Sequence, residues 1–327
     1  MKRARVLTAI VLSGCAVAGV AAQRGPRIPP TGAIKQVKDN LYVIPGAGGN
    51  TTVFVAANGV VLVDTKLAAN GEPIMNQVKT VTDKPMSMII NTHTHPDHNG
   101  SNDYFKTARP TIEVVTHENT KKWVEANPRS APAMKPDRTF ADTLTLGSGK
   151  DQIDLYYFGP AHTNGDAFIV FKALRAMCVG DVMAWKMAPL IDPATGGSVI
   201  ALPDTLEKAV KGIKNVDIVI EGHGDVNTWA GFRDYTRFSR ALLDAARAGL
   251  GKKTPEEIAA GLKPKFPVFT HEQLLEGMEY GGTPLSRAVI NVNVAFQELK
   301  GEPVTTNFGP PRAGGPGRGG AEAPPAK

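Results

Sequence analysis

Short apolar runs and longer amphipathic stretches alternate twice along this chain. Runs of four to six apolar residues bounded by glycine, asparagine or proline predict strands, whereas apolar residues spaced three or four apart predict helices. The alternation covers residues 40–126 and again residues 150–248. Two such halves facing each other would form an α/β fold, a four-layer αβ/βα sandwich with helices outside both sheets. Periodicity alone does not fix how the halves pack.

The expected elements follow from these patterns. Strands are expected at residues 41–45, 51–55, 60–64, 86–90, 111–115, 154–158, 167–171, 176–179 and 216–220. Helices are expected at residues 68–81, 100–105, 118–126 and 206–213, and the pattern is mostly helical from 229 to 299. The polar, proline-rich residues 127–142 are interpreted as a surface excursion.

The first 22 residues differ from the rest of the chain. Lys2, Arg3 and Arg5 precede an apolar stretch that is short for a membrane span and ends in small residues, which is typical of a secretory signal. A lipobox-like sequence ending at Cys15 offers an alternative, in which Cys15 carries lipid and the chain is anchored to a membrane. Both interpretations place the mature protein outside the cytoplasm, in the periplasm or secreted.

Composition favours a globular enzyme, with 42% hydrophobic and 21% charged residues. The formal charge is +6, and removal of the three basic residues of the N-terminal segment lowers it to +3. Because no basic run remains, nucleic acid is not expected as a partner. We divide the chain into a signal segment (1–22), an extended N-terminal linker (23–37), one folded domain with C-terminal helices (38–300) and a tail (301–327). The tail is rich in glycine and proline and is expected to be disordered.

The sequence HTHPDH at residues 93–98 directly follows an expected buried strand. His93 and His95 are two apart on an extended chain, so their side chains point the same way. After the proline the chain turns into a helix, which lets Asp97 and His98 aim at a second nearby point. Imidazole and carboxylate together suit zinc. A loop of solvated or capping histidines is the alternative, which the specific spacing disfavours.

Three later residues also lie at the ends of expected strands. His162 occurs in GPAHTNGD, Asp181 in VGD and His223 in GHG. A single histidine in such a place is more often a hydrogen-bonded structural residue than a ligand. Together with the HTHPDH loop, however, they gather at the strand ends where layered α/β folds build their sites.

In this order, the four motifs resemble those of the metallo-β-lactamase superfamily over about residues 38–235, in the Asp-bridged dinuclear form of lactamase-like and glyoxalase-type members. The resemblance implies an αβ/βα sandwich with its site at one edge between the sheets, and two Zn²⁺ ions per chain. By that resemblance one ion would be held by His93, His95 and His162, the other by Asp97, His98 and His223, and both by a bridging Asp181. A hydroxide between the metals would be the nucleophile, with Asp97 as the catalytic residue that orients it and moves its proton.

Other residues have weaker signals. Thr92, Thr163 and Asp64 are candidates for orienting the ligands, with ordinary turn or strand-end roles as the alternative. Glycines at 46–50 could form a flexible cover over the metals or a plain turn. Residues 182–187 could supply an apolar wall with one cation, or core packing. His117 and His271 are outside every motif and are expected to be structural.

The cysteines bear on both stability and subclass. If Cys15 leaves or is acylated, no disulfide can form within the chain. Cys178 is three residues before Asp181, an odd separation that puts it on the opposite face of its strand, so we expect a small buried core residue. Lactamases of the first subclass carry a cysteine where this chain has Asp181, which makes lactam hydrolysis less expected.

The resemblance therefore implies an exported dinuclear zinc hydrolase that attacks the carbonyl of a small ester, thioester, lactone or β-lactam. One alternative is a β-lactamase proper, acting on carbapenems or cephalosporins. Two others are a di-iron oxidoreductase, disfavoured by export and by the lack of a flavodoxin-like extension, and a non-catalytic metal-binding module, disfavoured by the complete ligand set. A small molecule is the expected partner, a membrane only if Cys15 is lipidated, and the sequence does not predict an oligomeric state.

Overall fold

The computed structural model describes residues 30–126, 135–270, 279–280, 283–284 and 286–304. The expected signal segment with Cys15, the tail from residue 305 and His271 lie outside this described part. Among the described residues, none of the helices has the length and apolar character needed to span a membrane.

The first half of the chain forms a seven-stranded sheet in the order β1 to β7. Its strands are β1 (Lys35–Lys38), β2 (Leu41–Ile44), β3 (Thr51–Ala56), β4 (Gly59–Val63), β5 (Met86–Ile90), β6 (Glu113–His117) and β7 (Arg138–Phe140). The first four strands are an antiparallel meander, and β4 to β7 run parallel. The helices between the parallel strands are α1 (Gly71–Val78), α2 (Pro96–Asn99), α3 (Asn102–Ala108) and α4 (Glu118–Ala126).

The second half forms a six-stranded sheet in the order β13-β12-β11-β10-β9-β8. Its strands are β8 (Thr143–Leu146), β9 (Ile153–Tyr156), β10 (Phe168–Phe171), β11 (Ala176–Cys178), β12 (Ile218–Ile220) and β13 (Asn227–Thr228). Only β11 and β12 pair in parallel, because α5 (Leu202–Gly212) crosses between them. The chain continues through α6 (Trp229–Gly249), α7 (Pro255–Leu262), α8 (Pro267–Thr270), the strand pair β14 (Glu279–Tyr280) and β15 (Thr283–Pro284), and α9 (Arg287–Lys300).

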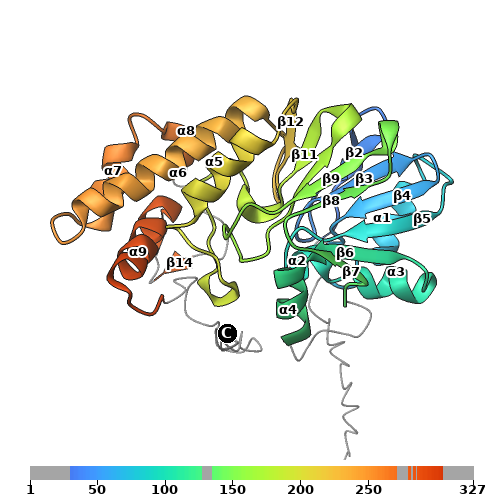
Figure 1. The fold of residues 1–327 in the computed structure, drawn as a ribbon, viewed down its shortest axis with the longest axis horizontal. Helices are drawn as coiled ribbons and strands as arrows, with labels where there is room; N and C mark the ends of the chain where they lie inside the picture. The colour runs from blue at the N-terminus through green and yellow to red at the C-terminus, as the bar shows by residue number, and fades with distance from the viewer. Residues whose placement is uncertain (1–29, 127–134, 271–278, 281–282, 285, 305–327) are drawn as a thin grey trace, which may run out of the picture.

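Alternation along the strands divides the core into three apolar clusters. On β10, Ile169 and Phe171 face the other sheet, whereas Phe168 and Val170 pack with α5 and α6. On β4, alternate residues likewise face the second sheet or pack with α1 and α3. Because each sheet is buried on both faces, the molecule has helix, sheet, sheet and helix layers, as Figure 1 shows. The four-layer αβ/βα sandwich expected from the sequence is therefore confirmed.

Six of the observed strands were not anticipated: β1, β7 and β8, and the two-residue strands β13, β14 and β15. Residues 35–37, assigned to the linker, belong to edge strand β1, whose only apolar residue is Val37. Residues 127–142, interpreted as a surface excursion, contain β7, which at three residues is too short to show a period. The strand β8 alternates threonine with leucine, a strand pattern that the sequence analysis overlooked because it is only four residues long. A helix was also expected from residue 68 but begins at Gly71, after the left-handed backbone of Ala69 (φ +67°).

Candidate metal centre

All seven candidate ligands meet at one edge of the sandwich, where the loops after β5, β9, β11 and β12 converge. They form two clusters: His93, His95, His162 and Asp181, and Asp97, His98 and His223. Within each cluster, one ligand atom per residue lies within 4.8 Å of the others. The family resemblance implied the same two groups of histidines, with Asp181 between them, whereas the structure gathers Asp181 with the first cluster.

A proline explains how one loop serves both clusters. His95 is extended (φ −71°, ψ 143°) and precedes α2, whose first residue is Pro96. Proline is favoured there because its fixed φ suits a helix start and its missing N–H would be unpaired in any case. Asp97 and His98 therefore leave the chain from a helical turn, whereas His93 leaves it from the extended segment before the turn.

His93 is fully buried and is held by one ring nitrogen only. Its Nδ1 lies 2.9 Å from Thr92 Oγ1, and its Nε2 has no hydrogen-bond partner among the described residues. Asp181 Oδ1 is likewise buried and makes no hydrogen bond of normal geometry among the described residues, although His98 Nε2 lies 3.2 Å away. Buried polar atoms are normally paired. A cation between the clusters would satisfy both atoms, so the residues present fit a metal.

The other two imidazoles of the first cluster are aimed by acceptors outside it. His95 Nε2 lies 2.8 Å from Asp192 Oδ2, which leaves His95 Nδ1 facing His162 Nε2 at 3.0 Å. On its far side, His162 Nδ1 lies 2.5 Å from the carbonyl oxygen of Leu190. Each ring is thus fixed through one nitrogen and presents the other to a common point, the usual arrangement of histidines that bind metal.

Asp181 contacts both clusters. Its Oδ1 lies 3.2 Å from His98 Nε2, and its Oδ2 lies 3.4 Å from His223 Nε2 and 3.8 Å from His162 Nε2. The second cluster is closed by Asp97, whose Oδ2 lies 3.3 Å from His223 Nε2. A carboxylate reached by imidazoles of both clusters has the geometry of a bridging ligand.

Asp64 orients ligands from beneath the loop. Its carboxylate lies 2.7 Å from His98 Nδ1 and accepts hydrogen bonds from the backbone N–H and hydroxyl of Thr92, at 2.8 and 2.7 Å. It therefore holds His98 directly and His93 through Thr92. Both residues had been candidates for this role.

Thr163, the third such candidate, does not contact a ligand. Its backbone N–H and hydroxyl both donate to Asp166, which closes their own loop. The sequence missed Asp192, because a carboxylate in a proline-containing loop has no spacing signal linking it to His95, 97 residues away.

Burial keeps the imidazoles of His93 and His162 neutral. It lowers the pKa of His93 well below its ordinary value, and the neighbouring imidazole of His98 adds to the effect. Burial, with His95, lowers the pKa of His162 to about 4. Neutral imidazole is the form that binds a metal.

At His98 of the second cluster and at the adjoining Asp181, charged neighbours outweigh burial in setting the pKa. Burial lowers the pKa of His98, but the carboxylates of Asp181 and Asp97 outweigh it and raise that pKa well above its ordinary value. Burial raises the pKa of Asp181, but His223 and His98 outweigh it and hold that pKa well below the ordinary value. The carboxylates thus concentrate negative charge here, which a divalent cation would neutralise.

The glycine turn at residues 46–50 packs against the ligands. Gly49 N–H donates to the carbonyl oxygen of Asp97 (2.9 Å), and a Cβ on Gly49 would lie 2.2 Å from His98 Cε1. Asn50 N–H donates to the carbonyl oxygen of Gly222 (2.6 Å). The turn is therefore part of the wall of the site, bonded to both halves of the molecule.

Residues 182–187 divide between core and site. The Trp185 ring stacks on His223 with centroids 4.2 Å apart and planes at 19°, and the other apolar residues of the stretch are buried. Trp185 and Lys186 both have left-handed backbones, with φ +58° and +52°. Lys186 N–H donates to Glu221, which supports this strained turn.

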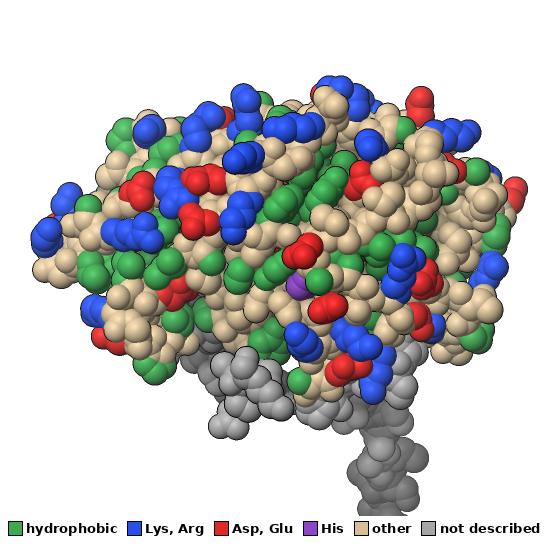
Figure 2. Space-filling model, in the orientation of Figure 1, with side chains coloured by type: hydrophobic (Ala, Val, Ile, Leu, Met, Phe, Trp, Pro, Cys, Tyr) green, Lys and Arg blue, Asp and Glu red, His purple; other side chains and the backbone are tan. Residues whose placement is uncertain are grey.

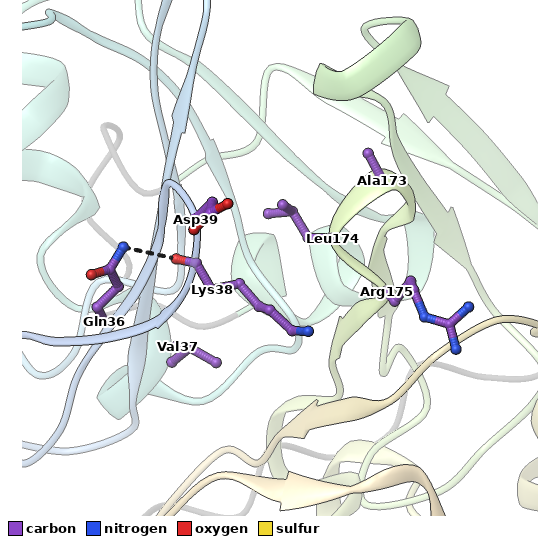
Figure 3. A pocket seen from close by; sticks show the side chains of 7 residues that line it. All are labelled: Gln36, Val37, Lys38, Asp39, Ala173, Leu174 and Arg175. Atoms are coloured by element: carbon purple, nitrogen blue, oxygen red, sulfur yellow. Dashed lines mark hydrogen bonds between the residues drawn. The ribbon is translucent and has the colours of Figure 1, made fainter.

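The centre reaches the surface on the side of Asp97. Its side chain is 31% exposed and that of His95 22%, whereas those of His98 and His162 are at most 1% exposed. In Figure 2 a histidine emerges between acidic side chains near the middle of the face shown. The hollow of Figure 3 is a separate feature, lined by Gln36, Val37, Lys38, Asp39, Ala173, Leu174 and Arg175.

Cys178 belongs to the core between the sheets, as expected, with its side chain 3% exposed. Burial raises the pKa of its thiol from 9.0 to about 12, which lowers the thiolate fraction at neutral pH by about a thousand-fold. In a Cys15→Ser chain we therefore expect Cys178 to resist maleimide until the protein is unfolded in guanidinium, because the thiolate is the reactive form. Mass spectrometry of the labelled chain measures this, and rapid labelling of the folded protein would contradict it.

Comparison with known proteins gives concordant results. Residues 44–184 match the model of the metallo-β-lactamase superfamily. The chain is 24% identical over 231 residues to the metallo-β-lactamase type 2 of Bacteroides fragilis, covering 66% of this chain and 88% of that protein. It is 26% identical over 211 residues to the protein of the same name from Elizabethkingia meningoseptica, covering 60% and 80%.

Solved structures extend the likeness in fold. A metallo-β-lactamase from Pontibacter korlensis superposes with a TM-score of 0.55 at 18% identity, covering 62% of this chain and 98% of that one. The sec-alkylsulfatase Pisa1 from Pseudomonas sp. superposes with a TM-score of 0.62 at 14% identity, covering 82% of this chain and 50% of that one. At these identities the likeness concerns the fold alone.

Proposed function

Because the chain belongs to the metallo-β-lactamase superfamily, whose members are mostly metallo-hydrolases, we propose that it is a dinuclear zinc hydrolase. The observation that carries the proposal is the pair of side-chain clusters joined by Asp181, with buried atoms of His93 and Asp181 left without hydrogen bonds. A histidine set kept only for structure would have its ring nitrogens paired.

We assign His93, His95 and His162 to one ion, Asp97, His98 and His223 to the other, and Asp181 to both. Imidazole and carboxylate donors without thiolate favour zinc over softer metals. When bound, a zinc pair supplies a water acidic enough to act as a nucleophile near neutral pH, and stabilises the oxyanion that develops on the carbonyl.

Asp97 is the residue placed to move the proton. Its carboxylate is the most exposed of those in the two clusters and lies at the mouth of the site, 3.3 Å from His223 Nε2. Burial raises its pKa, but His98 and His223 outweigh that effect, so the carboxylate stays ionised. An ionised carboxylate at this point can accept a proton from the attacking water and deliver it to the leaving group.

The proposed substrates are small esters, thioesters, lactones and β-lactams. β-Lactamase activity proper is the alternative favoured by the names of the relatives, whereas the aspartate at 181 favours the wider set. Asp64, Thr92 and Asp192 fix the ligands, and the turn at 46–50 with Trp185 shapes the entrance.

A substrate panel tests the proposal. We expect zinc-loaded protein to hydrolyse at least one member of a panel of carbapenem, cephalosporin, lactone, thioester and ester, and to lose that activity with a chelator. A sulfate ester belongs in the panel because the sec-alkylsulfatase shares the fold over most of this chain. Iron without zinc in the purified protein would favour the oxidoreductase alternative, and two bound zinc ions without any turnover would favour the binding module.

We also propose that the chain is exported, on the basis of its N-terminal pattern. Mass spectrometry of the mature protein in its native host should give a start after residue 22, or a lipid on Cys15 with membrane association. A mature chain that keeps Met1 and remains in the cytoplasm would contradict both forms of export.

A further inference from the structure

Lys66 is a buried lysine close to the candidate metal centre. Its side chain is 0% exposed, and its Nζ donates to the carbonyl oxygens of Ile44 (2.6 Å), Gly46 (2.8 Å) and Gly49 (2.8 Å). An ammonium has three N–H donors, so each one is paired. All three carbonyls belong to the end of β2 and the glycine turn at residues 46–50, so one side chain holds that whole turn.

The opposite side of the turn contacts the ligands of the second cluster. Gly49 bonds to the backbone of Asp97 and packs on the ring of His98. Asn50 makes three hydrogen bonds to the segment that carries His223, one from its backbone N–H and two from Nδ2 to the carbonyls on either side. Asp97 and His98 come from the first half of the chain and His223 from the second. The turn therefore ties together the two parts of the second cluster.

The backbone around Lys66 has a strained conformation that costs folding stability but connects this segment to the ligand loop. Asp64 and Lys66 both have left-handed φ angles, +62° and +63°, which side chains other than glycine rarely adopt. Backbone bonds tie this segment to the ligand loop, from Thr65 N–H to the carbonyl of His98 (2.7 Å) and from Gly100 N–H to the carbonyl of Lys66 (2.9 Å). A buried charge is also costly, and an apolar residue often stabilises a fold more.

We propose that Lys66 is a positioning residue for the second metal site. By holding the turn at residues 46–50, it sets the distance of Asp97 and His98 from the segment that carries His223. The first cluster has no bond to this turn among the described contacts, so its ion should not depend on Lys66. The inference rests on the proposed function only in assuming that the clusters bind two ions.

The test is a zinc titration of metal-free protein without substrate, by equilibrium dialysis and elemental analysis, comparing Lys66→Met with wild type. We expect the variant to bind its first ion with wild-type affinity and its second about 10- to 100-fold more weakly, the range for loss of an outer partner. In the metal-free variant, the amides of Gly49 and Asn50 should exchange hydrogen faster than in wild type.

Ile74→Ala is the matched control. Ile74 is fully buried in the cluster between α1 and the first sheet, so its truncation destabilises the fold without touching the turn. It should leave both zinc affinities unchanged. Lys66→Arg is a second variant in case the methionine variant does not fold. A planar guanidinium cannot place three donors on carbonyls gathered around one point, so it too should weaken only the second ion.

Two outcomes would overturn the inference. One is wild-type affinity for both ions in the folded Lys66 variants, and the other is an equal loss of both ions. A wild-type chain that binds fewer than two ions would contradict the proposed function and this inference together. Two ions in wild type, together with wild-type affinities for both ions in both Lys66 variants, would contradict the inference alone.

Discussion

A His95→Ala variant should lose nearly all hydrolytic activity and most of its bound zinc. The substitution removes the Nδ1 that faces His162 and leaves the Asp192 carboxylate without its imidazole partner. Loss of an outer partner typically lowers metal affinity 10- to 100-fold, so loss of the ligand itself should exceed about 100-fold. Elemental analysis gives the zinc content, and kcat/KM on whichever substrate the panel identifies gives the activity.

His117→Ala is the control for that experiment. His117 is another buried histidine, stacked on Tyr157 at 3.9 Å and outside both clusters. It should keep two zinc ions and most of the activity. Full activity with two zinc ions in His95→Ala would refute the ligand assignment.

Asp181→Ala should weaken the binding of both ions. The carboxylate contacts imidazoles of both clusters, His162 on one side and His98 and His223 on the other. Its removal therefore deletes a ligand from each site and leaves three imidazoles facing one another. Zinc titration should show two weakened steps.

Asp181→Asn distinguishes the effect of the carboxylate charge on zinc affinity from the effect of side-chain size. It keeps the size of the side chain and one oxygen donor, so its affinities should lie between those of wild type and the alanine variant. Loss of one ion with unchanged retention of the other would show that Asp181 does not bridge.

The gathering of the seven candidate ligands could be predicted because the HTHPDH spacing is specific and the other three residues, each a weak signal alone, all follow expected strands. The HTHPDH spacing encodes an extended segment followed by a proline-started helix, and the structure forms both. His162 and Asp181 each follow an apolar run, and the ends of such strands gather at one edge of a layered fold. The apolar runs along the chain likewise predicted two halves, each a sheet with helices outside it.

The residues that support the ligands could not be predicted, because their partners are distant in the sequence. Lys66 reads as an ordinary surface lysine in a turn, and only the folded chain brings three carbonyls around its ammonium. Trp185 follows Asp181 in a stretch that reads as core, and its left-handed backbone, which turns the ring onto His223, has no sequence signal. The glycine turn could be interpreted either as a flexible cover or as a plain turn, because its bonds to Asp97 and Gly222 join residues distant in the sequence.

The origin of the ligands has a consequence for maturation. The loop from His93 to His98 belongs to the first half of the chain, whereas His162, Asp181 and His223 belong to the second. Under the proposed function, neither half alone offers a complete site, so zinc can be captured only after the two sheets have docked. Zinc binding is then the last step of folding, and it stabilises only the correctly assembled chain because the unfolded chain lacks the complete site. A chain that crosses a membrane unfolded would bind zinc only in its final compartment. The zinc supply there would set the fraction of stabilised chain and therefore the resistance of the protein to proteolysis.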